Sequence, residues 1–150
     1  MVLNRQRRVP VSRRHVAQAA DRALAALGRI GASVEIALVD DDEIRRLNRA
    51  WRGVSRRTDV LAFPLETPDI GGLVGEVVVS AETAARQARR LGVPVAAELE
   101  LLVTHGVLHL VGYDDRDPVE AGLMHERERA ILSSRGRRPP RRLWKGLLPP

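Results

Sequence analysis

Apolar side chains recur every three or four residues between Ser12 and Leu27, which is the spacing of one face of an α-helix. Ser12 is a suitable N-terminal cap, and Gly28 is a suitable C-terminal stop. The apolar face consists of Val16, Ala19, Ala20, Ala23, Leu24 and Leu27. This pattern predicts a helix over residues 12–27.

Short segments rich in branched residues indicate strands. Residues 33–39 and 58–63 fit this pattern best. Residues 75–79 form a third such segment, and residues 2–5 form a short one near the N-terminus. The residues between the second and third of these segments, 65–72, are of types that favour turns.

Capping residues, prolines and glycines mark the ends of the other predicted helices, which span residues 40–50, 80–92, 95–111 and 117–133. Apolar residues dominate the third of these segments, so we expect it to be a buried central helix. A chain of 150 residues without an internal repeat is of the size of one domain. We expect that domain to cover residues 1–134.

The charge of the chain is unevenly distributed. Residues 1–134 carry 19 basic and 19 acidic side chains, whereas residues 135–150 carry six basic ones, no acidic one and four prolines. That composition predicts a basic, disordered tail. A second basic cluster lies near the N-terminus and contains Arg5, Arg7, Arg8, Arg13 and Arg14. Basic clusters favour a polyanionic partner, and solvated surface charge is the alternative.

Arginine provides 24 of the 25 basic residues, and only Lys145 is a lysine. The planar guanidinium group suits phosphate recognition. A nucleotide-composition bias of the genome is the simpler explanation of this preference, so the positions of the arginines are more informative than their number.

Cysteine is absent, which excludes disulfides, thiolate ligands and a cysteine nucleophile. Any metal site must therefore use His, Asp or Glu. No apolar run reaches the roughly 18 to 20 residues of a membrane span, and the Arg-rich first fourteen residues lead into no signal-like segment. We expect a soluble, unprocessed cytoplasmic protein without a membrane partner.

The segment HGVLHLVGYDD, residues 105–115, has the spacing of a metal site. His105 and His109 are four residues apart on a predicted helix, so they share one face at about 6 Å along the axis. Gly112 can end the helix and turn the chain back, which brings Asp114 or Asp115 toward the same point. Two His and one Asp with an open fourth position are typical of a catalytic zinc site.

Two other interpretations apply to these histidines. An isolated pair four residues apart on an apolar helix is often only a pair of core or surface side chains. His125 lies among charged residues of the last predicted helix, where we expect it to face solvent rather than the metal.

The segment NRAWRGVSRRTDVLAFP, residues 48–64, contains the second group of candidates. Arg52 follows a predicted helix, at the start of a connecting loop, where binding groups are often placed. Asp59 begins a strand, and we expect it to hold loop backbone rather than to act in catalysis. No glycine-rich phosphate loop is present, so we expect no nucleotide cofactor.

These segments resemble the signature motifs of the YbeY family of endoribonucleases. HGVLHLVGYDD is similar to H-G-x-L-H-L-x-G-Y-D-H, WRGVSRRTDVLAFP to R-G-x-x-x-x-T-D-V-L-S-F-P, and GEVVVS to G-D-I-x-I-S, in the family's order over residues 2–133. The resemblance implies an α+β fold in which helices flank a small mixed sheet and a central helix carries one zinc-type ion. It also implies that His105 and His109 are ligands and that Arg52 is required for activity.

The chain departs from the family at the third ligand, where Asp115 replaces a histidine. Carboxylate is a normal zinc ligand, so we expect His105, His109 and Asp115 to bind the ion. The added negative charge should make the ion less electrophilic and should make harder ions such as Mn²⁺ more competitive.

The resemblance implies a single-strand-specific, metal-dependent endoribonuclease of rRNA maturation and ribosome quality control, with the small ribosomal subunit as partner. Arg52, Arg5, Arg7 and Arg8 are the candidate RNA contacts. No general base can be named, because Gly106 stands where zinc proteases of the HExxH type keep a glutamate. The alternatives are a ribosome-associated RNA-binding factor that does not cleave and, less well supported, a zinc protease.

Overall fold

The computed structural model describes residues 1–53, 58–65, 72–134, 136 and 138–147. Its elements are β1 (Val2–Asn4), α1 (Arg13–Ala26), β2 (Ser33–Val39), α2 (Asp41–Arg52), β3 (Val60–Pro64), β4 (Leu73–Ser80), α3 (Ala81–Leu91), α4 (Val95–Leu110), α5 (Pro118–Leu132) and the 3₁₀ helix η1 (Arg141–Gly146).

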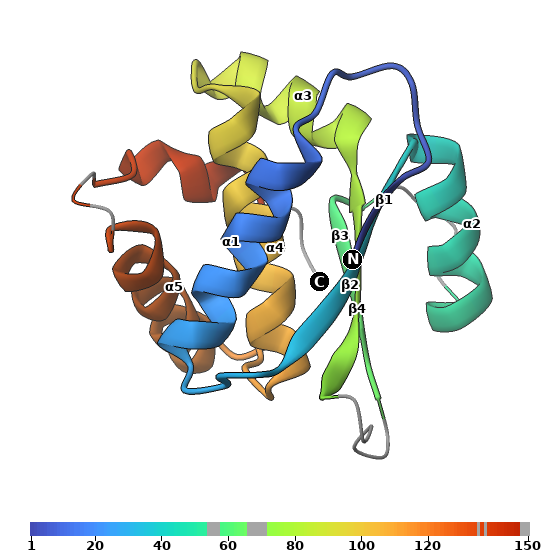
Figure 1. Ribbon diagram of the computed structural model, residues 1–150. Coiled ribbons are helices and arrows are strands. Elements are labelled where there is room, and N and C mark those ends of the chain that lie inside the picture. Colours follow the sequence, from blue (N-terminus) through green and yellow to red (C-terminus); the bar gives the residue numbers. More distant parts are fainter. Residues whose placement is uncertain (54–57, 66–71, 135, 137, 148–150) are drawn as a thin grey trace.

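The four strands form one mixed sheet in the order β1-β2-β4-β3. β1, β2 and β4 are parallel, and β3 runs antiparallel to β4 as an edge strand. Figure 1 shows α1, α4 and α5 on one side of this sheet and α2 alone on the other. The expected α+β fold, a small mixed sheet flanked by helices, is therefore confirmed.

Alternating side chains on the inner strands fill two separate cores, as the pleat of a strand requires. Ile36, Leu38, Val77 and Val79 pack with α1 and α4 in the larger core. The strand side chains that point to the other face pack against Ile44 of α2 in the smaller core. These strand residues are Ala37, Val39, Leu61 and Val78. The sheet is thus covered on both faces.

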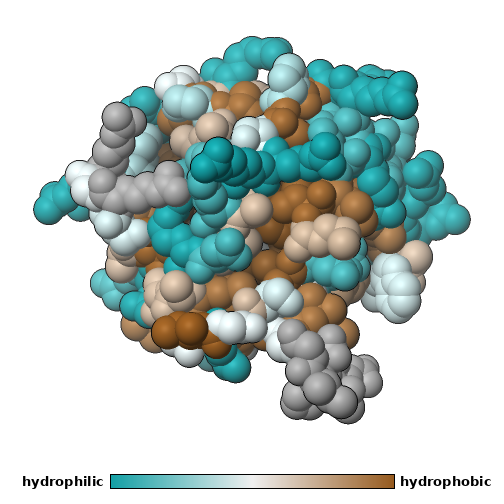
Figure 2. All heavy atoms as spheres, viewed as in Figure 1, coloured by the Kyte–Doolittle hydropathy of each residue, from teal (hydrophilic) through white to brown (hydrophobic). Residues whose placement is uncertain are grey.

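α2 buries only a narrow part of its surface, since Ile44 and Asn48 are its buried residues. Figure 2 shows hydrophilic side chains along the margin that α2 occupies.

Within the ranges described above, no helix is both long enough and apolar enough to span a membrane.

Four predicted helix starts are confirmed by side-chain caps, and at α2 Asp40 accepts a hydrogen bond from the backbone N–H of Glu43. Ser12 accepts a hydrogen bond from the backbone N–H of His15, and Asp117 accepts one from Glu120. Ser80 caps α3 through the backbone N–H of Thr83. Each cap satisfies a donor that would otherwise lack an intrahelical partner.

α4 lies unusually close to the sheet at Gly106. A Cβ atom at this position would stand 2.6 Å from Cγ1 of Val77 and 3.3 Å from Cγ2 of Val60. Only glycine fits this contact, and it fixes the part of α4 that carries His105 and His109. The close approach also leaves no room for a glutamate side chain at position 106.

The prediction of a disordered tail is wrong for residues 141–147. η1 packs against α3 and α5, and Leu143 is 1% exposed in a cluster that includes Leu101 and Leu132. The prolines and arginines of this segment are compatible with packing, because the apolar side chains between them reach the core. Residues 135, 137 and 148–150 lie outside the described residues.

Glu98 is a buried acid inside the helical layer. Its side chain is fully buried, and neither carboxylate oxygen has a hydrogen-bond partner within the described part of the chain. Burial raises the pKa of Glu98 from its ordinary 4.5 to about 7, and the negative charge of Asp59 adds to this rise while Arg90 opposes it. The folded chain therefore keeps a proton on Glu98 at pH values where the unfolded chain has lost it.

We expect Glu98→Gln to stabilise the protein at pH 8 and to have little effect near pH 4. The free energy of unfolding of the natural chain should fall as the pH rises from about 4.5 to 7, because only the unfolded state releases the Glu98 proton there. Glutamine mimics the neutral acid and should remove this loss, which is about 3 kcal/mol at pH 8. Urea denaturation of both proteins at several pH values measures the difference, and equal gains at pH 4 and pH 8 would contradict the assignment.

Candidate metal centre

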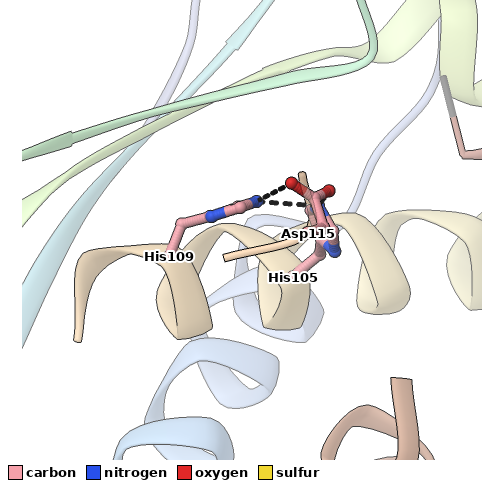
Figure 3. A group of neighbouring side chains, drawn as sticks. All are labelled: His105, His109 and Asp115. Carbon is pink, nitrogen blue, oxygen red and sulfur yellow. Dashed lines mark hydrogen bonds and ion pairs between the residues drawn. The ribbon is translucent and has the colours of Figure 1, made fainter. Parts of the chain in front are cut away.

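Three side chains that can ligate a metal converge at the C-terminal end of α4. His105 and His109 project from successive turns of the helix, and Asp115 approaches from the loop that follows, as Figure 3 shows. The two imidazole Nε2 atoms are 3.1 Å apart. Asp115 Oδ2 lies 3.3 Å from His105 Nε2, and Asp115 Oδ1 lies 3.6 Å from His109 Nε2.

The end of α4 explains how Asp115 reaches the two histidines. Gly112 has a φ of 105°, a backbone conformation that residues with a side chain rarely adopt. The backbone N–H of Gly112 still donates to the carbonyl oxygen of His109. The backbone N–H of Tyr113 donates to the carbonyl oxygen of Leu108. The chain thus reverses within two residues and returns along the helix.

Both imidazoles are held by the ring nitrogen that faces away from the cluster. His105 Nδ1 donates to Glu128 Oε2 at 2.7 Å, and His109 Nδ1 donates to the carbonyl oxygen of Tyr113 at 2.9 Å. Carbonyl and carboxylate oxygens only accept hydrogen bonds, so each Nδ1 carries the proton. The Nε2 atoms therefore face the centre of the cluster, where each offers a lone pair once it is deprotonated.

The spacing of the three donor groups fits one tetrahedral ion. Two ligands at about 2.0 to 2.1 Å from such an ion lie about 3.3 to 3.4 Å apart. The two Nε2 atoms at 3.1 Å and the pair His105 Nε2–Asp115 Oδ2 at 3.3 Å are close to this value, while His109 Nε2 is 3.6 Å from the other Asp115 oxygen. Asp115 Oδ1 is buried and has no hydrogen-bond partner within the described part of the chain. A buried acceptor in this position is what a cation would satisfy.

Hydrogen bonds and charges within the cluster shift the pKa values of its members. Burial lowers the pKa of His105, but hydrogen bonds and charges from Asp115 and Glu128 outweigh it and raise that pKa to about 9. Hydrogen bonds from His105 and His109 hold the pKa of Asp115 far below its ordinary range. For Glu128, burial raises the pKa, but the hydrogen bonds from His105 and His125 lower it by a larger amount. The pKa of Glu128 therefore lies below its ordinary value.

The cluster forms part of the wall of a cavity of about 560 Å³. Arg52, the last residue of α2, lines the same cavity, and so does Trp51 beside it. Arg116 contributes a further cation from the loop after α4. Asp59 lies at the start of β3 on the cavity wall, and its carbonyl oxygen accepts the N–H of Ser80.

The structure separates Asp115 from the other candidates near it. Asp114 lines the cavity but faces Arg116, with 3.3 Å from the guanidinium Nε to Oδ2. His125 is not among the three converging donors and instead bonds through Nδ1 to Glu128. Of the two aspartates that the sequence left open, Asp115 is therefore the one that joins the histidines.

The N-terminal arginines are not brought to the cavity. Arg5 pairs with Glu43 at 3.1 Å, and Arg8 pairs with Glu82 at 3.5 Å. They follow β1, which lies at the opposite edge of the sheet from β3. An RNA contact by Arg5, Arg7 or Arg8 therefore stays a prediction about a separate surface.

Two residues of the site had no signal in the sequence. Glu128 is fully buried against His105, although it stands in a run of charged residues that is typical of a solvated helix face. Trp51 is 71% exposed at the cavity, where an aromatic residue next to a helix end would ordinarily be assigned to the core.

Comparison with known proteins gives consistent matches. The sequence profile of a family described as Endoribonuclease YbeY matches residues 1–136. An Endoribonuclease YbeY of Anaeromyxobacter dehalogenans is 50% identical over 114 residues, covering 75% of this chain and 59% of that protein. The chain thus spans about three fifths of that relative. An Endoribonuclease YbeY of Geobacter sulfurreducens is 36% identical over 88% of this chain and 92% of its own length.

A solved structure has a similar fold. The solution structure of TM1509 from Thermotoga maritima superposes with a TM-score of 0.58 at 29% sequence identity, covering 89% of this chain and 87% of that protein. The profile match includes every residue of the candidate metal centre. The chain therefore belongs to the Endoribonuclease YbeY family.

Proposed function

We propose that this chain is a metal-dependent endoribonuclease that cleaves single-stranded RNA during rRNA maturation and ribosome quality control in the cytoplasm. The observation that supports this function best is the convergence of His105, His109 and Asp115 on a cavity also lined by Arg52. The names of the relatives, which call them endoribonucleases, agree with an RNA substrate.

His105, His109 and Asp115 would hold one divalent ion, zinc in the first place. When bound, such an ion supplies Lewis acidity at the scissile phosphate and acidifies a nearby water molecule. Asp115 gives the ligand set a negative charge and an oxygen donor. Both favour harder ions, so Mn²⁺ or a similar ion would compete with zinc for this site. Before an ion binds, the proton of His105 must leave, because a ligating nitrogen needs its lone pair.

Arg52, which lines the same cavity as the three candidate ligands, would bind the phosphate that is cleaved. It stands at the end of α2, followed by Gly53 in the left-handed conformation, with φ of 70°, so the chain turns away directly after it. A guanidinium group can form two parallel hydrogen bonds to phosphate oxygens and can neutralise charge that grows in the transition state. Arg116 adds positive charge to the same cavity.

Trp51 offers a stacking surface to an unpaired base. Its ring is held edge-on by Phe63, with 6.1 Å between ring centroids and 65° between planes, and most of the ring is exposed. Stacking on an aromatic side chain requires a base that is free of its neighbours in the strand. This arrangement therefore favours single-stranded over duplex RNA.

Metal removal should abolish cleavage, and Arg52→Lys should abolish most of it while leaving metal content unchanged. Lysine keeps the charge but cannot make the bidentate contact. The measurement combines elemental analysis with cleavage of a single-stranded small-subunit rRNA fragment, before and after chelator treatment and metal replacement. A duplex of the same sequence serves as the comparison substrate.

Arg49→Lys is the matched control, because Arg49 lies one turn earlier on α2 and does not line the cavity. It should cleave RNA like the natural chain. Full activity of the Arg52→Lys variant would remove Arg52 from the mechanism. A chain without bound metal that binds RNA in a salt-dependent way but never cleaves it would replace the nuclease by an RNA-binding factor.

A further inference from the structure

A fully buried carboxylate links the candidate ligand His105 to the C-terminal part of the chain. Glu128 Oε2 accepts a hydrogen bond from His105 Nδ1 at 2.7 Å. Its Oε1 accepts from His125 Nδ1 at 2.7 Å and from the indole Nε1 of Trp144 at 3.0 Å. Donors on α4, α5 and η1 therefore set the orientation of this single carboxylate.

Trp144 lies beyond the part of the chain that the family profile matches, which ends at residue 136. The segment around it is nevertheless firmly packed. Leu143 is 1% exposed, and Arg142 Nε donates to the carbonyl oxygen of Leu91 at 2.8 Å. The guanidinium group of Arg129 lies 5.3 Å from the centroid of the Trp144 ring, within the range of a cation–π contact.

The end of η1 is equally confined. A Cβ atom at Gly146 would stand 3.0 Å from Cδ1 of Leu91 and 3.3 Å from Oε1 of Glu98. A side chain at position 146 would therefore require Leu91 or Glu98 to shift by a few tenths of an ångström. Contacts on both sides of Trp144 thus hold its indole N–H against Glu128.

We propose that residues 141–147, which we call the C-terminal brace, hold His105 in its metal-binding orientation through Trp144 and Glu128. This inference rests on the proposed metal-dependent function. The partner of the second ring nitrogen fixes the orientation and the tautomer of a ligating histidine, and here that partner is Glu128. Trp144 is then a positioning residue, because it acts through Glu128 and does not line the cavity.

The geometry explains why the indole matters although it is one donor of three. His105 and His125 occupy one oxygen each, and the indole N–H is the second donor to Oε1. The indole N–H belongs to η1, whereas His105 is on α4 and His125 on α5. It therefore restrains rotation of the Glu128 carboxylate from a third element. A carboxylate that rotates carries the imidazole of His105 with it.

Trp144→Phe tests the brace, because it keeps an aromatic ring and removes the N–H. We expect Zn²⁺ to bind about tenfold more weakly to this variant, at the lower end of the effect of losing a group behind a ligand. Glu128→Gln should weaken binding by about 10- to 100-fold. The amide N–H of the glutamine can face His105 Nδ1 only if Nδ1 carries no proton. In a neutral imidazole the proton is then on Nε2, the atom that must bind the ion. Competition with a chromophoric chelator measures both affinities.

A second readout comes from the protein without metal. Imidazole ¹⁵N–¹H NMR spectra of the natural chain should show an Nδ1–H signal of His105 bonded to Glu128, and Trp144→Phe should shift this signal. Ile44→Val is the matched control for a small loss of stability, because Ile44 is a buried residue of α2, which packs on the other face of the sheet. It should bind Zn²⁺ like the natural chain.

The outcomes separate this inference from the proposed function. A natural chain that binds Zn²⁺ and a Trp144→Phe variant that binds it equally well would overturn the brace and leave the nuclease proposal standing. A natural chain that binds no divalent ion would overturn both. If Glu128→Gln fails to fold, Trp144→Phe still decides, since it removes a single hydrogen bond at the edge of the buried cluster.

Discussion

Substitution of His109 by alanine is expected to weaken metal binding by more than about 100-fold and to abolish RNA cleavage while the fold persists. Loss of a group behind a ligand already costs about 10- to 100-fold in affinity, and loss of the ligand itself costs more. His109 suits this test because its side chain is 27% exposed and its Nδ1 bonds only to a backbone carbonyl. In His105→Ala, by contrast, the buried Glu128 would lose a partner.

Elemental analysis after dialysis and cleavage of single-stranded RNA measure the two effects in the His109→Ala variant. The control is His15→Ala, which removes a histidine from α1, where its Nε2 lies 3.2 Å from the carbonyl oxygen of Ala96. That variant should retain metal and activity. One full equivalent of tightly bound metal in His109→Ala would show that the three converging side chains are a polar cluster and not a metal site.

Truncation of Leu143 to alanine is expected to lower the free energy of unfolding by about 2 to 4 kcal/mol. The side chain is 1% exposed and packs with Ala88, Leu101 and Leu132, so its removal leaves a cavity between α3, α4 and α5. Deletion of residues 139–150 should cost at least as much, because it removes the Trp144 hydrogen bond as well. Urea denaturation followed by far-ultraviolet circular dichroism measures the loss.

Leu123→Ala is the matched control for Leu143, since the same residue type lies 57% exposed on α5. It should change stability by less than about 0.5 kcal/mol. A Leu143→Ala variant as stable as the natural chain would mean that η1 does not pack on the core in solution, and it would weaken the case for the brace as well.

The helices and strands could be predicted from the sequence because each has a local signal. The predicted helix over residues 12–27 corresponds to α1, and the predicted strand over residues 33–39 has the bounds of β2. The strand order could not be predicted, because pairing β2 with β4 and placing β3 at the edge depends on contacts between distant segments. Hydrophobic periodicity contains no information about which strands are neighbours.

The candidate metal centre was predictable in part for the same reason. His105, His109 and Gly112 act through the geometry of one helix and its end, which sequence spacing specifies. The choice of Asp115 over Asp114 required the path of the loop, and Asp114 proved to face Arg116. The role of Glu128 required the packing of α5 on α4, because its neighbours in sequence are as charged as it is.

The C-terminal segment shows why composition is a weaker guide than periodicity. Six basic residues and four prolines in sixteen positions indicate disorder, and a 3₁₀ helix of six residues is too short to give a periodic signal. Leu143, Trp144 and Leu147 nevertheless pack against the core, and Arg142 bonds to the carbonyl oxygen of Leu91. Packing of this kind depends on a matching cavity in the rest of the fold, which no local pattern records.

The close contact between Gly106 and Val77 has a consequence for how an ion enters the site. Because α4 packs directly on the sheet at this point and hydrogen bonds to Glu128 and to the carbonyl oxygen of Tyr113 hold the two imidazoles, both histidines are in place before any ion arrives. The entropy cost of assembling the ligands is thus met during folding, and ion capture needs little further ordering of the chain. The site behaves as a rigid template built by the core, in contrast to a small zinc domain whose fold exists only around its ion.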